Sequence, residues 1–240
     1  MLELGLHLAI YAALFGLFAL VTGKPTLRAL ALGAAIYAAQ ALALRYAHYL
    51  PTPAFLQASS WNWIGKAVSI VAVLALFPLL TTDERRETGL TIRFKKGWAI
   101  RALPVVFLLV LLPIYFARNA KPEPWNTEAI AFQATMPGFA EELAYRGLML
   151  AVLNVAFLRP WKLPGAKFGP ALIITSLMFG VSHGVTLDDA GFSVNTFNLV
   201  RTTLSGFLYG YIMEACGTLI APIFAHNLSN AARYLFVMLK

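Results

Sequence analysis

The chain has 240 residues and a formal net charge of +8 at pH 7, and 59% of its residues are hydrophobic while only 12% are charged. A soluble domain typically carries about 25% charged residues, and the mean hydropathy here is +0.69. This composition excludes a disordered chain, a coiled coil, a disulfide-stapled mini-protein and an ordinary cytosolic enzyme. It indicates a protein that lies mostly in lipid.

Long apolar runs follow one another along the whole sequence. A helix that crosses a bilayer needs about 20 mostly apolar residues, and the sequence contains about eight candidate runs. In chain order they are Leu4–Val21, Leu27–Tyr46, Trp61–Leu80, Trp98–Phe116, Thr127–Leu158, Pro170–His183, Thr196–Met213 and Leu219–Leu239. The runs are continuous rather than alternating, and only helix bundles and closed barrels satisfy the backbone in hydrocarbon. We therefore predict an all-α, polytopic membrane bundle of about eight transmembrane helices.

A single integral-membrane domain over residues 1–240 is expected. Residues 1–80 hold the N-terminal helices, with a turn predicted at Thr22–Pro25. Residues 81–126 hold a charged linker and the fourth helix, and residues 127–240 hold the core with the polar motifs. The first run has no basic segment before it and no small-residue cleavage site after it, so we expect it to be retained rather than removed as a signal peptide.

The excess of positive charge has a membrane explanation. About half of the basic residues cluster in short linkers, where the positive-inside rule and anionic lipid headgroups account for them. We therefore expect a lipid bilayer and no nucleic acid as a partner. The one cysteine, Cys216, excludes an intrachain disulfide and a cysteine-built metal site, and its apolar neighbours predict a packing role.

Three charges interrupt the fifth run: Glu141, Glu142 and Arg146. Facing lipid they would together cost on the order of 8–10 kcal/mol, so they must face the bundle interior or a wet cavity. Glu142 and Arg146 are four residues apart on one helix face, which predicts an ion pair. Glu141 lies about 100° away around the helix, and the spacing leaves it without a partner. The alternative is a buried salt-bridge cluster that only fixes packing.

Two further polar pairs lie in apolar runs. His183 ends the sixth run with Phe179 one turn before it, and His226 and Asn230 share a face of the eighth. A single membrane histidine is more often an interhelical hydrogen-bonding group than a catalyst, so only the combination with the acids is informative. The histidines without acidic neighbours are interpreted as interfacial or packing residues: His7 and His48.

Such a set of side chains can hydrolyse an amide without a covalent intermediate. A buried carboxylate can act as a general base towards water, and a histidine beside it can return the proton to the leaving amine. A second histidine and an asparagine can donate hydrogen bonds to the developing oxyanion. Ser182 and Ser229 are interpreted as packing hydroxyls, because neither lies in a Gly-x-Ser-x-Gly motif.

A zinc site is the alternative use of the same residues. Glu141, His183 and His226 have the carboxylate and imidazole groups found in zinc hydrolases. The sequence contains no His-Glu-x-x-His motif, and Asn230 is a poor zinc ligand. We therefore expect no cofactor and keep zinc as the alternative.

Three short motifs occur in a fixed order. Glu141 to Arg146 reads Glu-Glu-x-x-x-Arg, Phe179 to His183 reads Phe-x-x-x-His, and His226 to Asn230 reads His-x-x-x-Asn. In this order, on late helices of a polytopic chain, the motifs resemble those of the CAAX prenyl protease and bacteriocin-processing (CPBP, Abi) family of glutamic intramembrane proteases. The resemblance extends over about Glu128–Tyr234, and the first three runs match it only in hydropathy.

The resemblance implies a function and a role for each motif residue. It implies an intramembrane endopeptidase, similar to CAAX proteases, that cleaves a membrane-tethered protein or peptide. Glu141 and His183 are then expected to activate the water, while His226 and Asn230 hold the oxyanion. The supporting residues are expected to be Glu142, Arg146 and Phe179. The location that fits is the plasma membrane of a prokaryote, with several passes of the chain.

Two classes of membrane protein without protease activity remain as alternatives. A transporter could use Glu141, His183 and His226 as a proton relay, although no inverted repeat is visible in the sequence. An immunity-type scaffold could keep the fold and bind a partner. If the protein is a protease, the polar loop Gly184–Val194, directly after His183, is expected to form the mouth for the substrate.

Overall fold

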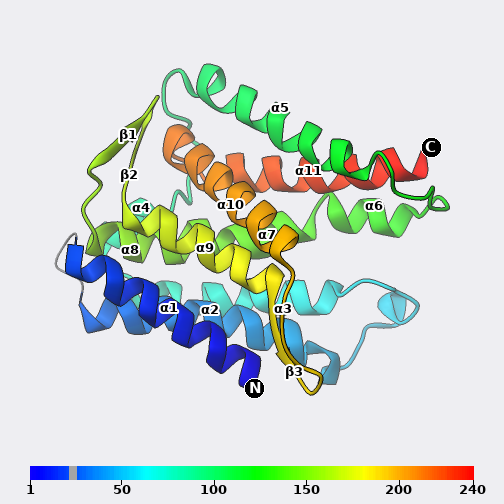
Figure 1. The fold of residues 1–240 in the computed structure, drawn as a ribbon, viewed down its shortest axis with the longest axis horizontal. Coiled ribbons are helices and arrows are strands. Elements are labelled where there is room, and N and C mark those ends of the chain that lie inside the picture. The colour runs from blue at the N-terminus through cyan, green and yellow to red at the C-terminus, as the bar shows by residue number, and fades with distance from the viewer. Residues whose placement is uncertain (22–25) are drawn as a thin grey trace.

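The computed structural model describes residues 1–21 and 26–240, and the predicted turn at Thr22–Pro25 lies outside the described residues. The chain is all-helical with a few short strands, as predicted (Figure 1). Among the described residues, three segments are long and apolar enough to cross a membrane: Leu2–Leu20, Leu27–Tyr49 and Trp98–Ala117. Two shorter apolar helical segments are Trp63–Leu79 and Pro170–Gly184.

The elements follow one another in a simple order. They are α1 (Leu2–Val21), α2 (Leu27–Tyr46), η1 (Ala47–Tyr49), η2 (Ala54–Leu56), α3 (Trp63–Leu74), η3 (Phe77–Leu79), α4 (Thr82–Glu87), α5 (Trp98–Ala117), α6 (Thr127–Gln133), α7 (Met136–Glu142), η4 (Leu143–Met149), α8 (Leu150–Ala156), β1 (Trp161–Leu163), β2 (Ala166–Phe168), α9 (Pro170–Gly184), β3 (Val185–Asp188), β4 (Gly191–Val194), α10 (Thr196–Cys216) and α11 (Ile220–Met238). The second predicted run coincides with α2, and the runs that became α5, α9, α10 and α11 are displaced by three residues or fewer.

The fifth predicted run, 127–158, is not one helix. It forms α6, α7, η4 and α8, and Pro137 lies in the first turn of α7. Proline has no backbone N–H to donate to the preceding turn, so it is well tolerated in the first turn of a helix and often marks a new helix start. The third run is also shorter than predicted, because α3 ends at Leu74 and the separate turn η3, with Pro78 as its second residue, begins at Phe77.

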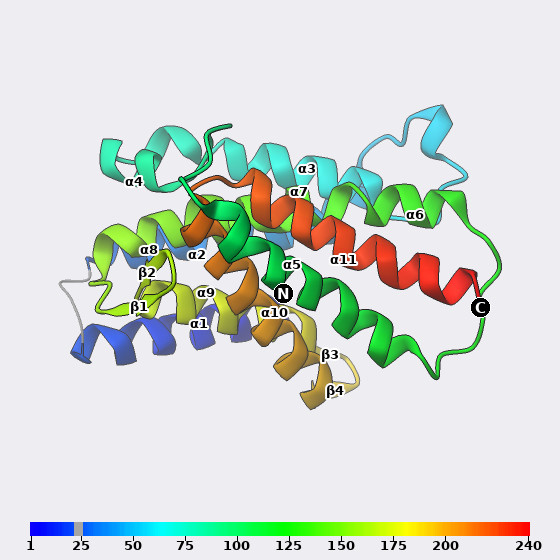
Figure 2. The same cartoon turned by 90° about the horizontal axis from the view of Figure 1, so that it is seen from above.

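The segment from α7 to α8 is the centre of the bundle. Figure 1 shows α7 and α8 between α1, α2 and α3 on one side and α5, α10 and α11 on the other, and Figure 2 shows the same bundle from above. All seven residues of η4 are buried. This segment is a π-helical turn, in which the N–H of Leu150 donates to the carbonyl of Tyr145 five residues earlier. The polar motif residues on this segment are therefore held among helices rather than against lipid.

Glycines bring α9 and α10 close together. Gly180 and Gly184 lie one turn apart on α9, and Gly206 and Gly210 do so on α10. A Cβ atom at Gly184 would lie 2.6 Å from the backbone of Leu199, so only glycine allows this approach. Small residues at such spacing let membrane helices pack backbone to backbone.

The charged linker closes one end of the bundle through ion pairs. The Arg28 guanidinium donates to both oxygens of Glu84, at 2.6 and 2.9 Å, and Arg159 donates to Glu87 at 2.6 Å. Burial raises the pKa of the Glu84 carboxyl, but the hydrogen bonds from Arg28 and Thr81 outweigh burial and hold that pKa below its usual value. The contribution of the ionised Glu84 carboxylate to the stability of the folded state is therefore present at neutral pH and is lost as the pH falls through this lowered pKa.

Two short hairpins connect helices. In the first, Trp161 pairs with Phe168, and in the second, Val185 pairs with Val194. The second hairpin contains most of the loop 184–194 and follows α9 directly. Its Val185 carbonyl lies 3.0 Å from Nε2 of His7 on α1.

Candidate active site

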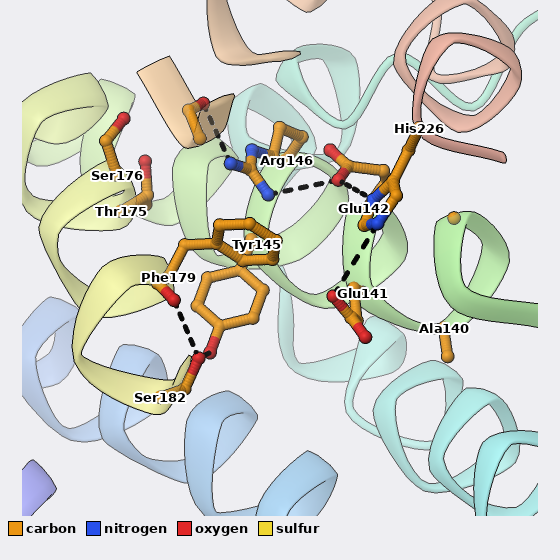
Figure 3. A network of polar contacts seen from close by, with 12 residues as sticks. Ala140, Glu141, Glu142, Tyr145, Arg146, Thr175, Ser176, Phe179, Ser182 and His226 are labelled. Carbon is orange, nitrogen blue, oxygen red and sulfur yellow. Dashed lines mark hydrogen bonds and ion pairs between the residues drawn. The ribbon is translucent and has the colours of Figure 1, made fainter. Parts of the chain in front are cut away.

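Helices α7, α9 and α11 bring one carboxylate and two imidazoles together. Oε2 of Glu141 lies 3.7 Å from Nε2 of His183 and 3.9 Å from Nε2 of His226. These distances exceed the 2.7–3.2 Å of a direct hydrogen bond, so Glu141 faces the two imidazoles but forms no direct hydrogen bond with either. Figure 3 shows the Glu141 carboxylate below the His226 ring.

The other oxygen of Glu141 has a partner that the sequence spacing did not reveal. Nζ of Lys66 on α3 lies 2.5 Å from Oε1 of Glu141. The interpretation that Glu141 is without a partner is therefore wrong. Lys66 precedes Glu141 by 75 residues, and no rule of spacing along one helix connects the two. The two oxygens are thus distinct, because Oε1 is bound to an ammonium group and Oε2 faces the imidazoles.

Glu142 is the centre of a second, fully buried network. Nη1 of Arg146 donates to Oε1 of Glu142 at 3.2 Å, which confirms the ion pair predicted from the spacing. Nη2 of Arg146 donates to the carbonyl of Gly206 at 2.8 Å, and Nδ1 of His226 lies 2.8 Å from Oε1 of Glu142. Figure 3 shows this chain of contacts from α10 through Arg146 and Glu142 to His226. An ionised carboxylate only accepts hydrogen bonds, so Nδ1 of His226 carries a proton.

The second motif fixes the His183 ring. Nδ1 of His183 donates to the carbonyl of Phe179 at 2.7 Å, because a carbonyl can only accept. The neutral ring therefore presents an unprotonated Nε2 to Glu141. The hydroxyl of Ser182 donates to the same carbonyl at 2.9 Å, and the hydroxyl of Ser229 donates to the carbonyl of Leu109 at 2.6 Å. Each serine hydroxyl thus donates to a backbone carbonyl.

Aromatic rings fix His226 and Arg146. The ring of Tyr209 stacks on His226, with centroids 4.8 Å apart and planes 7° from parallel. The ring of Phe179 meets His226 edge-on at 5.9 Å, and the Arg146 guanidinium lies 4.6 Å from the centre of the Phe179 ring. Phe179 therefore contacts both the buried cation and the His226 imidazole.

Two cavities reach the Glu141 carboxylate. The first, of about 550 Å³, is lined by all four expected catalytic residues, with Asn230 one turn beyond His226 on α11. The second, of about 360 Å³, lies against α1 and α2 and is also lined by Glu141 and His183. The loop Gly184–Val194 lines neither of these two cavities, so the expectation that it forms the mouth is not supported.

Residues outside the three motifs also take part in the site. Lys66 and Tyr209 contact the motif residues directly, and Arg201 and Arg233 line the first cavity. A lone cation inside an apolar run is the signal that could have identified Lys66, as it identified Arg146. Of the remaining histidines, His7 is buried, lies 2.7 Å from the Tyr37 hydroxyl and lines the second cavity, and His48 is exposed.

The comparisons with known proteins agree with the three motifs. Residues 123–232, a little under half of the chain, match the family model described as type II CAAX prenyl endopeptidase Rce1-like. No curated protein and no solved structure matches the chain. The matched segment contains α6 to α10, most of α11, and every residue of the three motifs. Residues 123–232 of this chain are therefore similar to the Rce1-like family of type II CAAX prenyl endopeptidases.

Proposed function

We propose that this protein is a multi-pass intramembrane endopeptidase that hydrolyses a peptide bond of a membrane-tethered substrate with water activated by Glu141 and His183. The observation that carries the proposal is the Glu141 carboxylate, which holds Lys66 with one oxygen and faces two imidazole nitrogens with the other. The Rce1-like segment supports a protease at the level of the family. We further propose that the apolar segments, about eight in number, each cross the bilayer once. A location in the plasma membrane of a prokaryote stays a prediction.

The attacking water would be bound between Glu141 and His183. Polar atoms separated by more than 3.5 Å can be bridged by a water molecule, and Oε2 of Glu141 and Nε2 of His183 are 3.7 Å apart. Both atoms accept hydrogen bonds when the carboxylate is ionised and the ring is neutral. A water that donates to both directs its oxygen lone pair into the cavity, and Glu141 takes the proton as the C–O bond forms.

The oxyanion would be bound by His226 and Asn230. Because Nδ1 of His226 already donates to Glu142, its Nε2 can donate only when the ring is an imidazolium. The two neighbouring carboxylates stabilise that positive charge, and the amide of Asn230 supplies a second donor from the next turn of α11. The tetrahedral intermediate then collapses, the C–N bond breaks, and the proton held at the Glu141–His183 pair passes to the leaving amine.

Lys66 would hold Glu141 in its catalytic orientation. Replacing Lys66 with Met leaves Oε1 of Glu141 without its ammonium partner, so we expect kcat to fall about 100-fold because the base is misplaced. The measurement is the steady-state rate in liposomes, with kcat and KM determined separately. The matched control is Lys66→Arg, which keeps the positive charge and is expected to recover most of the rate. Wild-type kcat in Lys66→Met would exclude this role.

The reaction is proposed to need no metal. An ammonium group 2.5 Å from Glu141 repels a divalent cation and competes with it for the carboxylate. In the zinc alternative, Glu141, His183 and His226 would hold the metal, which would activate the water as a Lewis acid.

One experiment tests both the endopeptidase activity and its independence from a metal. The purified protein is reconstituted in liposomes with a library of peptides that carry a membrane anchor at one end, and products are identified by mass spectrometry before and after treatment with a chelator. We expect cleavage at one defined bond and the same rate after chelation. Loss of activity that zinc restores would overturn the metal-free mechanism. If the folded protein cleaves none of the peptides and instead conducts protons in the same liposomes, the endopeptidase proposal is overturned in favour of the transporter.

A further inference from the structure

Two arginines in the first cavity have no acidic partner in the part of the chain that the structure describes. Arg201 on α10 and Arg233 on α11 are both half-buried and both line the cavity that holds Glu141. Within residues 1–21 and 26–240, no carboxylate forms an ion pair with either of them. The other arginines in the bundle that are half-buried or buried and belong to ion pairs are Arg146 and Arg159.

The two charges oppose one another. Arg233 lies close enough to Arg201 to repel its charge, and burial removes part of the water around the Arg201 guanidinium. The guanidinium carbon of Arg233 also lies 5.2 Å from the centre of the ring of Tyr234, which lines the same cavity. Like charges that share a half-buried space are stabilised by an anion between them, and the guanidinium fork matches a carboxylate with two parallel hydrogen bonds.

Both arginines lie at the same end of the cavity. Tyr209 on α10 stacks on His226 on α11, which places these two residues at one level. The two helices are joined by a short turn around Gly217, so they run in opposite directions. Arg201 precedes Tyr209 by two turns and Arg233 follows His226 by two turns, which is about 10–12 Å along each helix. Measured along the helix axes, both arginines are therefore displaced from the His226 imidazole by about 10–12 Å, towards the same end of the cavity.

We propose that Arg201 and Arg233 form a subsite that binds a carboxylate of the peptide substrate. This inference rests on the proposed endopeptidase function and adds a requirement on the sequence that is cleaved. An extended peptide advances about 3.3–3.6 Å per residue, so a carboxylate at this subsite belongs to a residue about three positions from the scissile bond. The carboxylate can be that of an acidic side chain or that of a free C-terminus.

Four anchored peptides distinguish the two sources. All four share one cleavable sequence. Two have an amidated C-terminus and carry either glutamate or glutamine about three positions from the scissile bond. The other two end about three positions from that bond, one with a free C-terminal carboxylate and one with an amidated C-terminus. We expect the glutamate peptide or the free-acid peptide to have a KM at least about tenfold lower than its neutral counterpart, as one charged hydrogen-bonding partner provides. Equal KM values for all four peptides, with normal cleavage, would overturn the subsite and leave the endopeptidase proposal intact.

Variants of the two arginines test whether they cause the preference for a peptide with a carboxylate. Arg201→Gln and Arg233→Gln are each expected to raise KM about tenfold for the preferred acidic peptide, with no change for its neutral counterpart. The matched control is Arg118→Gln, which removes the same charge at the exposed end of α5, outside the residues that line the cavity. Its KM is expected to equal that of the wild type. If the arginine variants weaken all peptides equally, and only in liposomes with anionic lipids, the arginines bind lipid headgroups and the proposal is wrong.

A binding measurement tests the subsite without catalysis. Fluorescent versions of the four peptides are titrated onto Glu141→Gln protein in liposomes of neutral lipid. We expect tighter binding of a carboxylate peptide, and loss of that difference when Arg201 and Arg233 are both glutamine. Equal binding of the charged and neutral peptides would overturn the subsite even if no peptide were cleaved.

Discussion

Glu141→Gln is expected to lower kcat by about 100- to 10,000-fold, the range that one general base contributes. The glutamine amide has almost the shape of the carboxylate, and its oxygen can still accept a hydrogen bond from Lys66. It cannot take a proton from water. Folding is therefore expected to be retained, with a melting temperature close to that of the wild type. The measurement is the initial rate of cleavage of an anchored peptide in liposomes, with the amount of folded protein determined in the same samples.

A second carboxylate provides the matched control. Glu128 on α6 accepts hydrogen bonds from the Trp63 indole and the Ser59 hydroxyl, and it lines neither of the two cavities that reach Glu141. Glu128→Gln is expected to cleave at the wild-type rate. Full activity in Glu141→Gln would overturn the mechanism proposed above. Equal losses of activity in the two variants would indicate that removing a negative charge, rather than removing the general base, lowers the rate.

Arg146→Met is expected to be the most destabilising single substitution in the bundle. The guanidinium is completely buried, and its loss leaves the Glu142 carboxylate without the Arg146 cation and the Gly206 carbonyl without its side-chain donor. Breaking a buried pair from one side costs about 3–5 kcal/mol, a large part of a net stability of about 5–15 kcal/mol. The measurement is the midpoint of thermal unfolding in detergent, and we expect a marked decrease.

The double variant separates charge from packing. Glu142→Gln combined with Arg146→Met leaves no unpaired charge, so it is expected to unfold at a higher temperature than Arg146→Met alone. If the double variant is less stable than the single variant, packing around Phe179 rather than the orphaned carboxylate causes the loss. Wild-type stability in Arg146→Met would show that the buried pair contributes nothing.

Local patterns were sufficient for much of the structure. The apolar runs predicted an all-helical chain, and α2 begins and ends where its run does. The spacing of Glu142 and Arg146 predicted their ion pair, because both side chains belong to one helix and the helical period sets the angle between them. The same rule could not describe the fifth run, which contains Pro137 and a π-helical turn, since both change the angle between residues on either side.

Residue types and their spacing were enough to predict that Glu141, Glu142 and Arg146 lie inside a helical bundle, because charges are too costly against lipid, and that Glu142 pairs with Arg146. Three features could be recognised only in the folded chain: Lys66 binds Glu141, Tyr209 stacks on His226, and Arg201 and Arg233 share one end of a cavity. The reason is that spacing along a chain sets directions around one helix, whereas contacts between helices depend on how closely their backbones approach. Between α9 and α10, for example, glycines allow the close approach.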